Sequence, residues 1–172
     1  EPSHNLRAVL EALEFLGSVE GLAFAHKALT VSTVGDERLF EALARSPVKP
    51  ALALSLHTTN DTLRRELLPR AARIPVEDLL ERALRYGDLA KFPVQIEWTL
   101  LSGVNDRLDE AERLAGFLKG RRAMVNYIDL NAVPGSDFRP VPEVRAEELI
   151  TVLRRSGTVA TLRKSAARTV EG

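Results

Sequence analysis

The strongest constraint on the fold is a regular alternation between segments of helical periodicity and short apolar segments typical of strands. Helices are predicted at residues 5–16, 36–45, 60–67, 76–86, 108–118 and 146–155, and strands at residues 28–33, 51–56, 92–101, 124–130 and 159–163. Strands separated by helices in units of similar length indicate parallel βαβ packing. Because no linker, low-complexity stretch or internal repeat interrupts these units, residues 1–172 are predicted to form a single α/β domain.

An open, doubly wound sheet and a (β/α) barrel both satisfy this alternation, and the third predicted strand favours the barrel. Residues 94–99 read Val-Gln-Ile-Glu-Trp-Thr, with apolar and polar side chains in strict alternation. A parallel strand that is buried on both faces is nearly continuously apolar. One face of this strand is therefore expected to pack on helices, while the other, which carries Glu97, faces a polar lumen. Glu97 should have hydrogen-bond partners there, because an unpaired buried charge costs several kcal/mol.

The amino-acid composition limits which binding partners and which cellular location can be expected for this chain. The 24 Lys and Arg residues balance the 24 Asp and Glu residues, so the formal net charge is zero and any RNA binding must come from a local patch. No apolar run is long enough to span a bilayer, so no membrane partner is expected. The chain has no cysteine, which excludes disulfides and thiolate metal sites within it and favours a cytoplasmic location. Because it starts with Glu1 rather than Met, we expect it to be a piece of a longer protein.

Polar residues are predicted at the carboxyl ends of successive strands. The residues concerned are Ser32, Ser55, His57 and Asn131. In (β/α) barrels these positions carry the functional residues, and Ser55 and His57, which are two apart, would share one face of a strand. Hydroxyl, imidazole and amide groups at one edge would form a hydrogen-bonding pocket for a polar cofactor. Taken singly, each residue also fits a structural role, as a helix cap or a half-buried histidine.

Other chemical signals are weak. The sequence has neither a Gly-x-Gly-x-x-Gly motif nor a P-loop, which argues against the usual nucleotide cradles. The histidines His4, His26 and His57 lack metal-ligand spacing. The arginines between residues 64 and 73 could contact phosphate, but a solvated helix face is the expected interpretation.

Six motifs, in order along the chain, carry a family resemblance. They are Glu1-Pro2 with Asn5, Val31-Ser32-Thr33-Val34-Gly35, Leu54-Ser55-Leu56-His57 with Asn60-Asp61, Glu97 with Leu100-Leu101-Ser102-Gly103-Val104-Asn105-Asp106, Asn126 to Asn131 with Val133-Pro134-Gly135, and Thr161-Leu162-Arg163-Lys164. With these motifs the sequence resembles the radical S-adenosylmethionine (SAM) enzymes that methylate C2 of adenine in ribosomal and transfer RNA, the RlmN/Cfr type. The resemblance covers nearly the whole chain.

The resemblance implies a partial (β/α) TIM-like barrel of the radical SAM type, with parallel strands. By that resemblance Glu1 would meet the amino group of SAM, and the rest of the cofactor site would be lined by Ser32, Ser55, Leu56, His57 and Asn131. A 4Fe-4S cluster would be held by three cysteines before Glu1, and a methyl-carrying cysteine would follow Gly172. In the family, the cluster cleaves SAM to a radical that acts on this methyl group before adenine C2 is methylated. Ribosomal RNA is the implied partner, with transfer RNA as a further substrate.

Departures from the family motifs leave the substrate open. They include Asp129, Leu130, Ala132, Ser102, Thr58-Thr59 and Ser3-His4, and they are expected on loops that face the substrate. A radical SAM enzyme with another substrate and a non-catalytic barrel scaffold are therefore alternatives. Without the cysteines, this chain alone is expected to bind SAM weakly and to be catalytically inactive.

Overall fold

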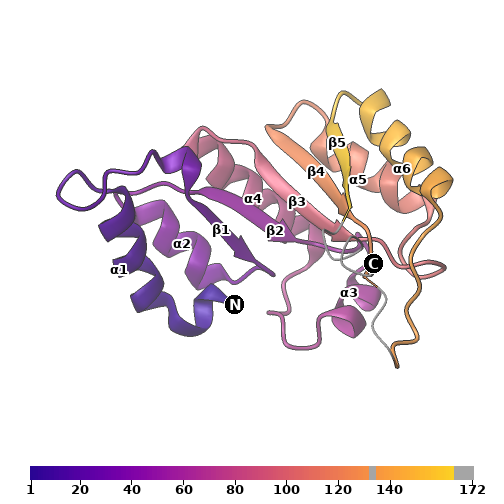
Figure 1. Cartoon of the computed structure of the whole chain (residues 1–172), viewed down its shortest axis with the longest axis horizontal. Coiled ribbons are helices and arrows are strands. Elements are labelled where there is room, and N and C mark those ends of the chain that lie inside the picture. Colours follow the sequence, from indigo (N-terminus) through magenta and orange to yellow (C-terminus); the bar gives the residue numbers. More distant parts are fainter. Residues whose placement is uncertain (132–134, 165–172) are drawn as a thin grey trace, which may run out of the picture.

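The computed structural model describes residues 1–131 and 135–164 and contains a five-stranded parallel sheet in the order β1-β2-β3-β4-β5 (Figure 1). The strands are β1 (Thr30–Thr33), β2 (Ala51–Ser55), β3 (Val94–Thr99), β4 (Ala123–Ile128) and β5 (Val159–Arg163). Sequence order and spatial order coincide, which agrees with the predicted succession of βαβ units. None of the helices in these two ranges combines the length and apolar character needed to cross a membrane.

The described residues also form six α-helices and two short 3-10 turns, at Pro2–Asn5 and His26–Ala28. The helices are α1 (Leu6–Gly17), α2 (Glu37–Arg45), α3 (Asp61–Leu67), α4 (Val76–Ala90), α5 (Leu108–Leu118) and α6 (Glu143–Arg155). The predicted cap of α3 is confirmed, because the Asn60 side chain accepts hydrogen bonds from the backbone N–H groups of Thr62 and Leu63.

Two helices are longer than the sequence predicted. Helix α4 continues to Ala90 and ends at Lys91, which has a left-handed backbone with φ 66°. Glycine is the usual residue at such a cap, and a lysine in its place does not signal the end of a helix. Helix α6 begins at Glu143, directly after Pro142 and three residues before the predicted start. The first strand is shorter than predicted because His26–Ala28 forms a 3-10 turn.

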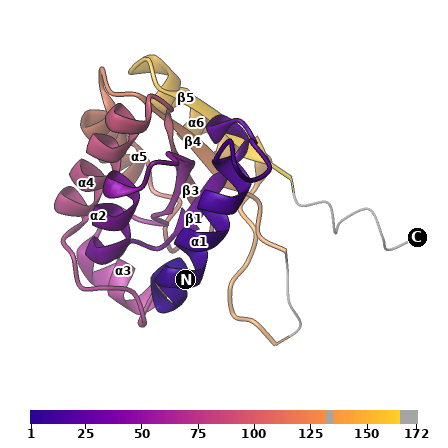
Figure 2. The same cartoon turned by 90° about the vertical axis from the view of Figure 1, so that its left-hand side faces the viewer.

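One face of the sheet is sealed by helices. Neighbouring strands place Leu54, Ile96, Val125 and Ala160 side by side, and all four are buried. Figure 2 shows α2, α4 and α5 on one side of the strands, whereas the described part of the loop between β4 and α6 extends on the other side. The apolar core therefore lies between the sheet and these helices.

The opposite face carries a continuous polar row. The same pairing places Ser55, Glu97, Asn126 and Thr161 side by side across β2 to β5. The Asn126 side-chain amide donates to the Glu97 carboxylate (Nδ2 to Oε1, 2.7 Å), and the Thr161 hydroxyl donates to the side-chain oxygen Oδ1 of Asn126 (3.1 Å). The prediction that Glu97 points away from the helices and has a polar partner is confirmed.

Strand β1 forms one edge of this sheet and pairs only with β2 among the described residues. Such an edge presents unpaired N–H and C=O groups that another strand can bind.

The sealed face should dominate stability. Leu54 is fully buried in the centre of the sheet, whereas Leu89 on α4 is 49% exposed. We expect Leu54→Ala to lower the free energy of unfolding by about 2–5 kcal/mol. The matched change Leu89→Ala should lower it by about 1 kcal/mol or less. Denaturant unfolding followed by circular dichroism measures both, and equal losses would contradict the assignment of the core face.

Candidate functional site

The carboxylate of Glu1 lies at the carboxyl end of β1. Its Oε1 accepts from the Thr33 hydroxyl (2.7 Å), and its Oε2 accepts from the Val34 N–H (2.8 Å). Thr33 in turn accepts from the Gly35 N–H (2.9 Å). Gly35 has φ 100°, and a Cβ there would lie 2.3 Å from Leu79, so only glycine fits this turn. The first residue of the chain is thus fixed at the edge where the sequence predicted a site.

The two predicted serines lie on the open face of the sheet. Ser32 is exposed and pairs in register with Ala53, and Ser55 is half-buried beside Glu97. Both lie near the carboxyl ends of their strands, at the same edge as Glu1. Their placement agrees with the prediction of a shared edge, while their role in binding a cofactor stays a prediction.

The strand alternation predicted for residues 55–57 ends earlier than expected. Leu56 donates its N–H to the Glu97 carbonyl oxygen (3.0 Å), and its side chain is fully buried, so only its main chain can meet a ligand. His57 has a left-handed backbone with φ 65°, outside β2. The expectation that Ser55 and His57 share a strand face is therefore wrong. The left-handed turn, which no glycine signals, changes the direction of the chain.

The imidazole of His57 is held by the neighbouring strand. Its Nδ1 accepts a hydrogen bond from the Thr99 N–H (3.0 Å). Burial, and second the nearby Arg64 cation, lower the pKa of His57 from its ordinary value of 6.5 to about 4. At neutral pH the ring is therefore uncharged, and its proton is on Nε2.

Arg64 is buried rather than solvated, so the interpretation of the arginines between residues 64 and 73 as solvated is wrong for this residue, whereas Arg65, Arg70 and Arg73 are exposed as expected. Only 4% of its surface is exposed. Its guanidinium donates from Nη2 to the carbonyl oxygen of Val34 and, at 3.5 Å, to that of Ser55. The cation therefore joins the carboxyl ends of β1 and β2. Burial lowers the pKa of Arg64, while Asp61 acts in the opposite direction.

Asn105, in the loop after β3, connects the ends of two strands. Its Nδ2 donates to the carbonyl oxygens of His57 and Thr99, each at 2.8 Å, and its Oδ1 accepts from the Leu101 N–H (2.7 Å). Asn105 is 1% exposed, so its amide is saturated by these main-chain groups. Asn105 belongs to one of the six sequence motifs, but its residue type and spacing did not indicate this role.

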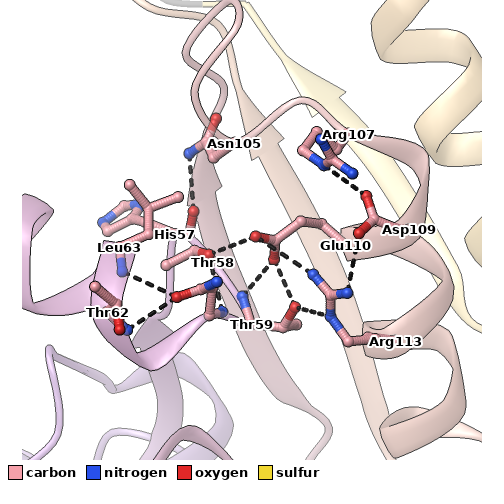
Figure 3. A network of polar contacts seen from close by, with 11 residues as sticks. His57, Thr58, Thr59, Thr62, Leu63, Asn105, Arg107, Asp109, Glu110 and Arg113 are labelled. Atoms are coloured by element: carbon pink, nitrogen blue, oxygen red, sulfur yellow. Dashed lines mark hydrogen bonds and ion pairs between the residues drawn. The ribbon is translucent and has the colours of Figure 1, made fainter.

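Glu110 of α5 holds the residues that follow His57 (Figure 3). Its carboxylate accepts from the Thr58 hydroxyl (2.8 Å), the Thr59 N–H (2.6 Å) and the Thr59 hydroxyl (2.5 Å). Arg113 lies 3.7 Å away, and Glu110 itself is 3% exposed. Thr58 and Thr59 were expected to face the substrate; they face α5 instead. No sequence motif indicated Glu110.

Asn131 lies three residues after the end of β4 and is exposed. It is at the same edge of the sheet as the other predicted residues. Two sequence features near Asn131 lie outside the described residues. They are the predicted turn at residues 133–135, apart from Gly135, and the difference from the family motif at position 132. A hollow of about 360 Å³ opens nearby at the ends of β4 and β5, and its lining includes Leu100, Asp129, Leu162 and Lys164.

No metal centre is formed by the residues that the structure describes, since they contain no group of three or more His, Cys, Asp or Glu side chains that could hold an ion. The whole chain has no cysteine. It therefore offers no thiolate ligand for an iron–sulfur cluster.

Comparison with curated proteins finds relatives along the whole chain, although no family model matches it. It is 50% identical over all 172 residues to a protein of Methylibium petroleiphilum named a probable RNA methyltransferase, and covers 48% of that protein. A protein of Pseudomonas aeruginosa with the same designation is 45% identical over the whole chain, which covers 49% of it. The chain thus spans about half the length of the curated relatives it matches.

Solved structures confirm the predicted fold class. A radical SAM methyltransferase from Sphaerobacter thermophilus superposes with a TM-score of 0.87 at 37% identity, over 96% of this chain and 49% of that one. A domain of a pyruvate-formate lyase-activating enzyme from Bacteroides vulgatus superposes with a TM-score of 0.72 over 95% of this chain and 94% of that one. At 20% identity, the second match shows the fold alone. The described residues thus form an α/β partial barrel of five parallel strands, similar in structure to the radical SAM methyltransferase from Sphaerobacter thermophilus.

Replacing Arg64 should destabilise the strand ends. We expect Arg64→Met to lower the free energy of unfolding by about 1–3 kcal/mol, because two carbonyl oxygens lose their donor. It should also raise the pKa of His57, since Arg64 lowers it. Denaturant unfolding and an NMR titration of the imidazole measure the two effects. Arg65→Met, at the exposed neighbouring position, is the matched control and should change neither quantity.

Acidification should destabilise the fold through His57. Below pH 6.5 the unfolded chain protonates this histidine, whereas the folded protein resists protonation until about pH 4. Stability contributed by neutral His57 is therefore complete above pH 6.5 and is lost as the pH falls to 4. The loss is on the order of 3 kcal/mol. In denaturant unfolding, His57→Gln should show a weaker pH dependence between pH 7 and 4; an unchanged dependence would contradict the assignment.

Proposed function

We propose that this chain forms the SAM-contacting part of a radical SAM enzyme that methylates C2 of an adenine in ribosomal RNA, with transfer RNA as a further substrate. One observation carries the proposal. The Glu1 carboxylate is fixed at the carboxyl end of β1, at the edge where Ser32, Ser55 and His57 also lie. The same residue types in the same order constitute the family motifs.

The residues at this edge fit the chemical groups of SAM. A carboxylate at Glu1 suits the ammonium group of the methionyl moiety, because charge-assisted hydrogen bonds are the strongest available to it. The hydroxyls of Ser32 and Ser55 and the N–H of His57 can pair with the neutral polar groups of a nucleoside. These residues would bind and orient the cofactor, while the helices on the far face exclude water from beneath them.

An iron–sulfur cluster would have to be held by residues other than those of this chain, which has no cysteine. When bound, a reduced cluster supplies the electron that radical SAM chemistry requires. The part that falls to this chain is positioning. Arg64 and Asn105 fix the main chain at the ends of β1, β2 and β3, so the polar groups at the edge are held before a ligand arrives.

Local charge supports an RNA substrate even though the net charge of the chain is zero. Arg163 is exposed at the end of β5. Arg139 is also exposed, and its carbonyl oxygen accepts from the Ser102 N–H (3.0 Å), which places it beside the loop after β3. Both cations lie on the carboxyl side of the sheet, where they can contact phosphates and position an RNA without reading its sequence.

The charge of Glu1 provides a test. In the full-length protein that carries this sequence, Glu1→Gln should weaken SAM binding by about 10–100-fold, because a hydrogen bond to a charged group is worth about 1.5–3 kcal/mol. Glu14→Gln, at an exposed position of α1, is the matched control and should bind SAM normally. Calorimetric titration measures the affinity; equal binding by both variants would refute the assigned site.

The reaction itself is tested with the same full-length protein. We expect reductant-dependent cleavage of SAM to 5′-deoxyadenosine, and 2-methyladenosine in ribosomal RNA analysed by nucleoside mass spectrometry. The isolated 172-residue chain should give neither product. Cleavage without a methylated RNA base would indicate a radical SAM enzyme with another substrate. Absence of cleavage in the reconstituted protein would favour the non-catalytic scaffold and refute the proposal.

A further inference from the structure

The segment His57–Thr59 is fixed almost entirely by the last residue of β3 and by groups that follow this strand in the chain. Thr99, at the end of β3, donates its N–H to the His57 ring, and Asn105 donates to the His57 carbonyl oxygen. From α5, Glu110 then accepts from both threonines (Figure 3). Because ring and main chain are held together, neither can turn without breaking contacts to β3 or α5.

The ring of His57 has one nitrogen left for a ligand. Nδ1 already accepts a hydrogen bond, so in the neutral ring the proton is on Nε2. Within the described residues Nε2 makes no hydrogen bond, and it is not among the buried polar atoms that lack a partner. Nε2 is therefore an accessible donor next to the cofactor edge.

The hydrogen-bond donors around the buried carboxylate of Glu110 come from the segment that contains His57. Two hydroxyls and one main-chain N–H of the His57 segment surround it, and the Arg113 guanidinium lies 3.7 Å away. A buried carboxylate needs several donors to offset its desolvation. Three of these donors come from two consecutive residues, so the carboxylate can be satisfied only when the segment has this conformation.

We infer that Glu110 is a positioning residue of the proposed cofactor site, which holds the His57 segment so that Nε2 of the ring can donate to a hydrogen-bond acceptor of the ligand. This rests on the proposed function, in which the ligand is SAM. The ligand atom must then be an uncharged or anionic acceptor, such as a ribose oxygen, a ring nitrogen of adenine or a carboxylate oxygen. An ammonium or amino group cannot occupy this position, because it would oppose the Nε2–H with another donor.

The tautomer is measured directly, without a ligand. Histidine-selective ¹⁵N labelling of the full-length protein should show, for His57, one nitrogen protonated and one unprotonated between pH 5 and 8. His57→Gln identifies the signal by its disappearance. A His57 ring that is protonated at Nδ1, or that averages between two tautomers, would overturn the inference whether or not SAM binds.

Positioning by Glu110 is tested by affinity and by the same spectrum. Glu110→Gln should weaken SAM binding about 10-fold and broaden the His57 signals, because an amide group cannot accept from three donors at these two oxygens. Glu112→Gln, exposed on the same helix, should behave as wild type. A loss of stability with unchanged affinity and unchanged His57 signals would show that Glu110 is merely structural and would refute the assignment.

A second pair of variants controls for misfolding. Thr58→Ser keeps the hydroxyl that Glu110 accepts from, whereas Thr58→Val removes it at nearly constant volume. The valine variant should weaken SAM binding, and the serine variant should restore it; equal affinities would contradict the positioning role. If the wild-type protein binds no SAM while the His57 tautomer is as expected, the proposed function fails but the donor assignment stands.

Discussion

The arrangement of the site depends on one geometric constraint, the alternation of side chains along parallel strands of which one face is covered by helices. Once Ile96 is buried against the helices, Glu97 must point to the opposite face. The pairing register then carries this division across the sheet, so that Ser55, Asn126 and Thr161 lie beside Glu97. The polar row across four strands is thus a consequence of which residues of each strand are apolar and face the helices. The hydrogen bonds of Asn126 to Glu97 and Thr161 are possible only because the register is exact.

At the carboxyl ends of the strands this alternation stops, and local hydrogen bonds determine the geometry. A left-handed residue other than glycine costs about 1 kcal/mol or more. At His57 this cost is offset by the bonds that its ring and its carbonyl oxygen make to Thr99 and Asn105. Both partners belong to the segment of chain around the end of β3. The conformation of one strand end is therefore determined by the next strand.

The helices and strands were predictable because their apolar periodicity is local information, and the β5 bounds agree with the prediction. The common edge of Ser32 and Ser55 followed from topology, since parallel strands end together. The place of Glu1 at this edge was indicated only by the family resemblance. The orientation of His57 could not be predicted in this way, because no glycine in the sequence signals its left-handed turn. Arg64 and Glu110 were missed for a different reason. Both are charged residues on amphipathic helices, and only contacts to distant segments show that they are buried.

These two buried charges also determine what remains for a ligand. Arg64 is turned toward the main-chain carbonyl oxygens at the ends of β1 and β2, and Glu110 is satisfied by Thr58 and Thr59. Neither is directed at the open face, and His57 is kept neutral partly by the Arg64 cation. Among the predicted ligand-binding residues, Glu1 at the end of β1 is then the one that carries a negative charge. The residues at the end of β2 are uncharged hydrogen-bond donors. A ligand with a cation at one end and neutral acceptors at the other is complementary to this order, which is the polarity the proposed function requires.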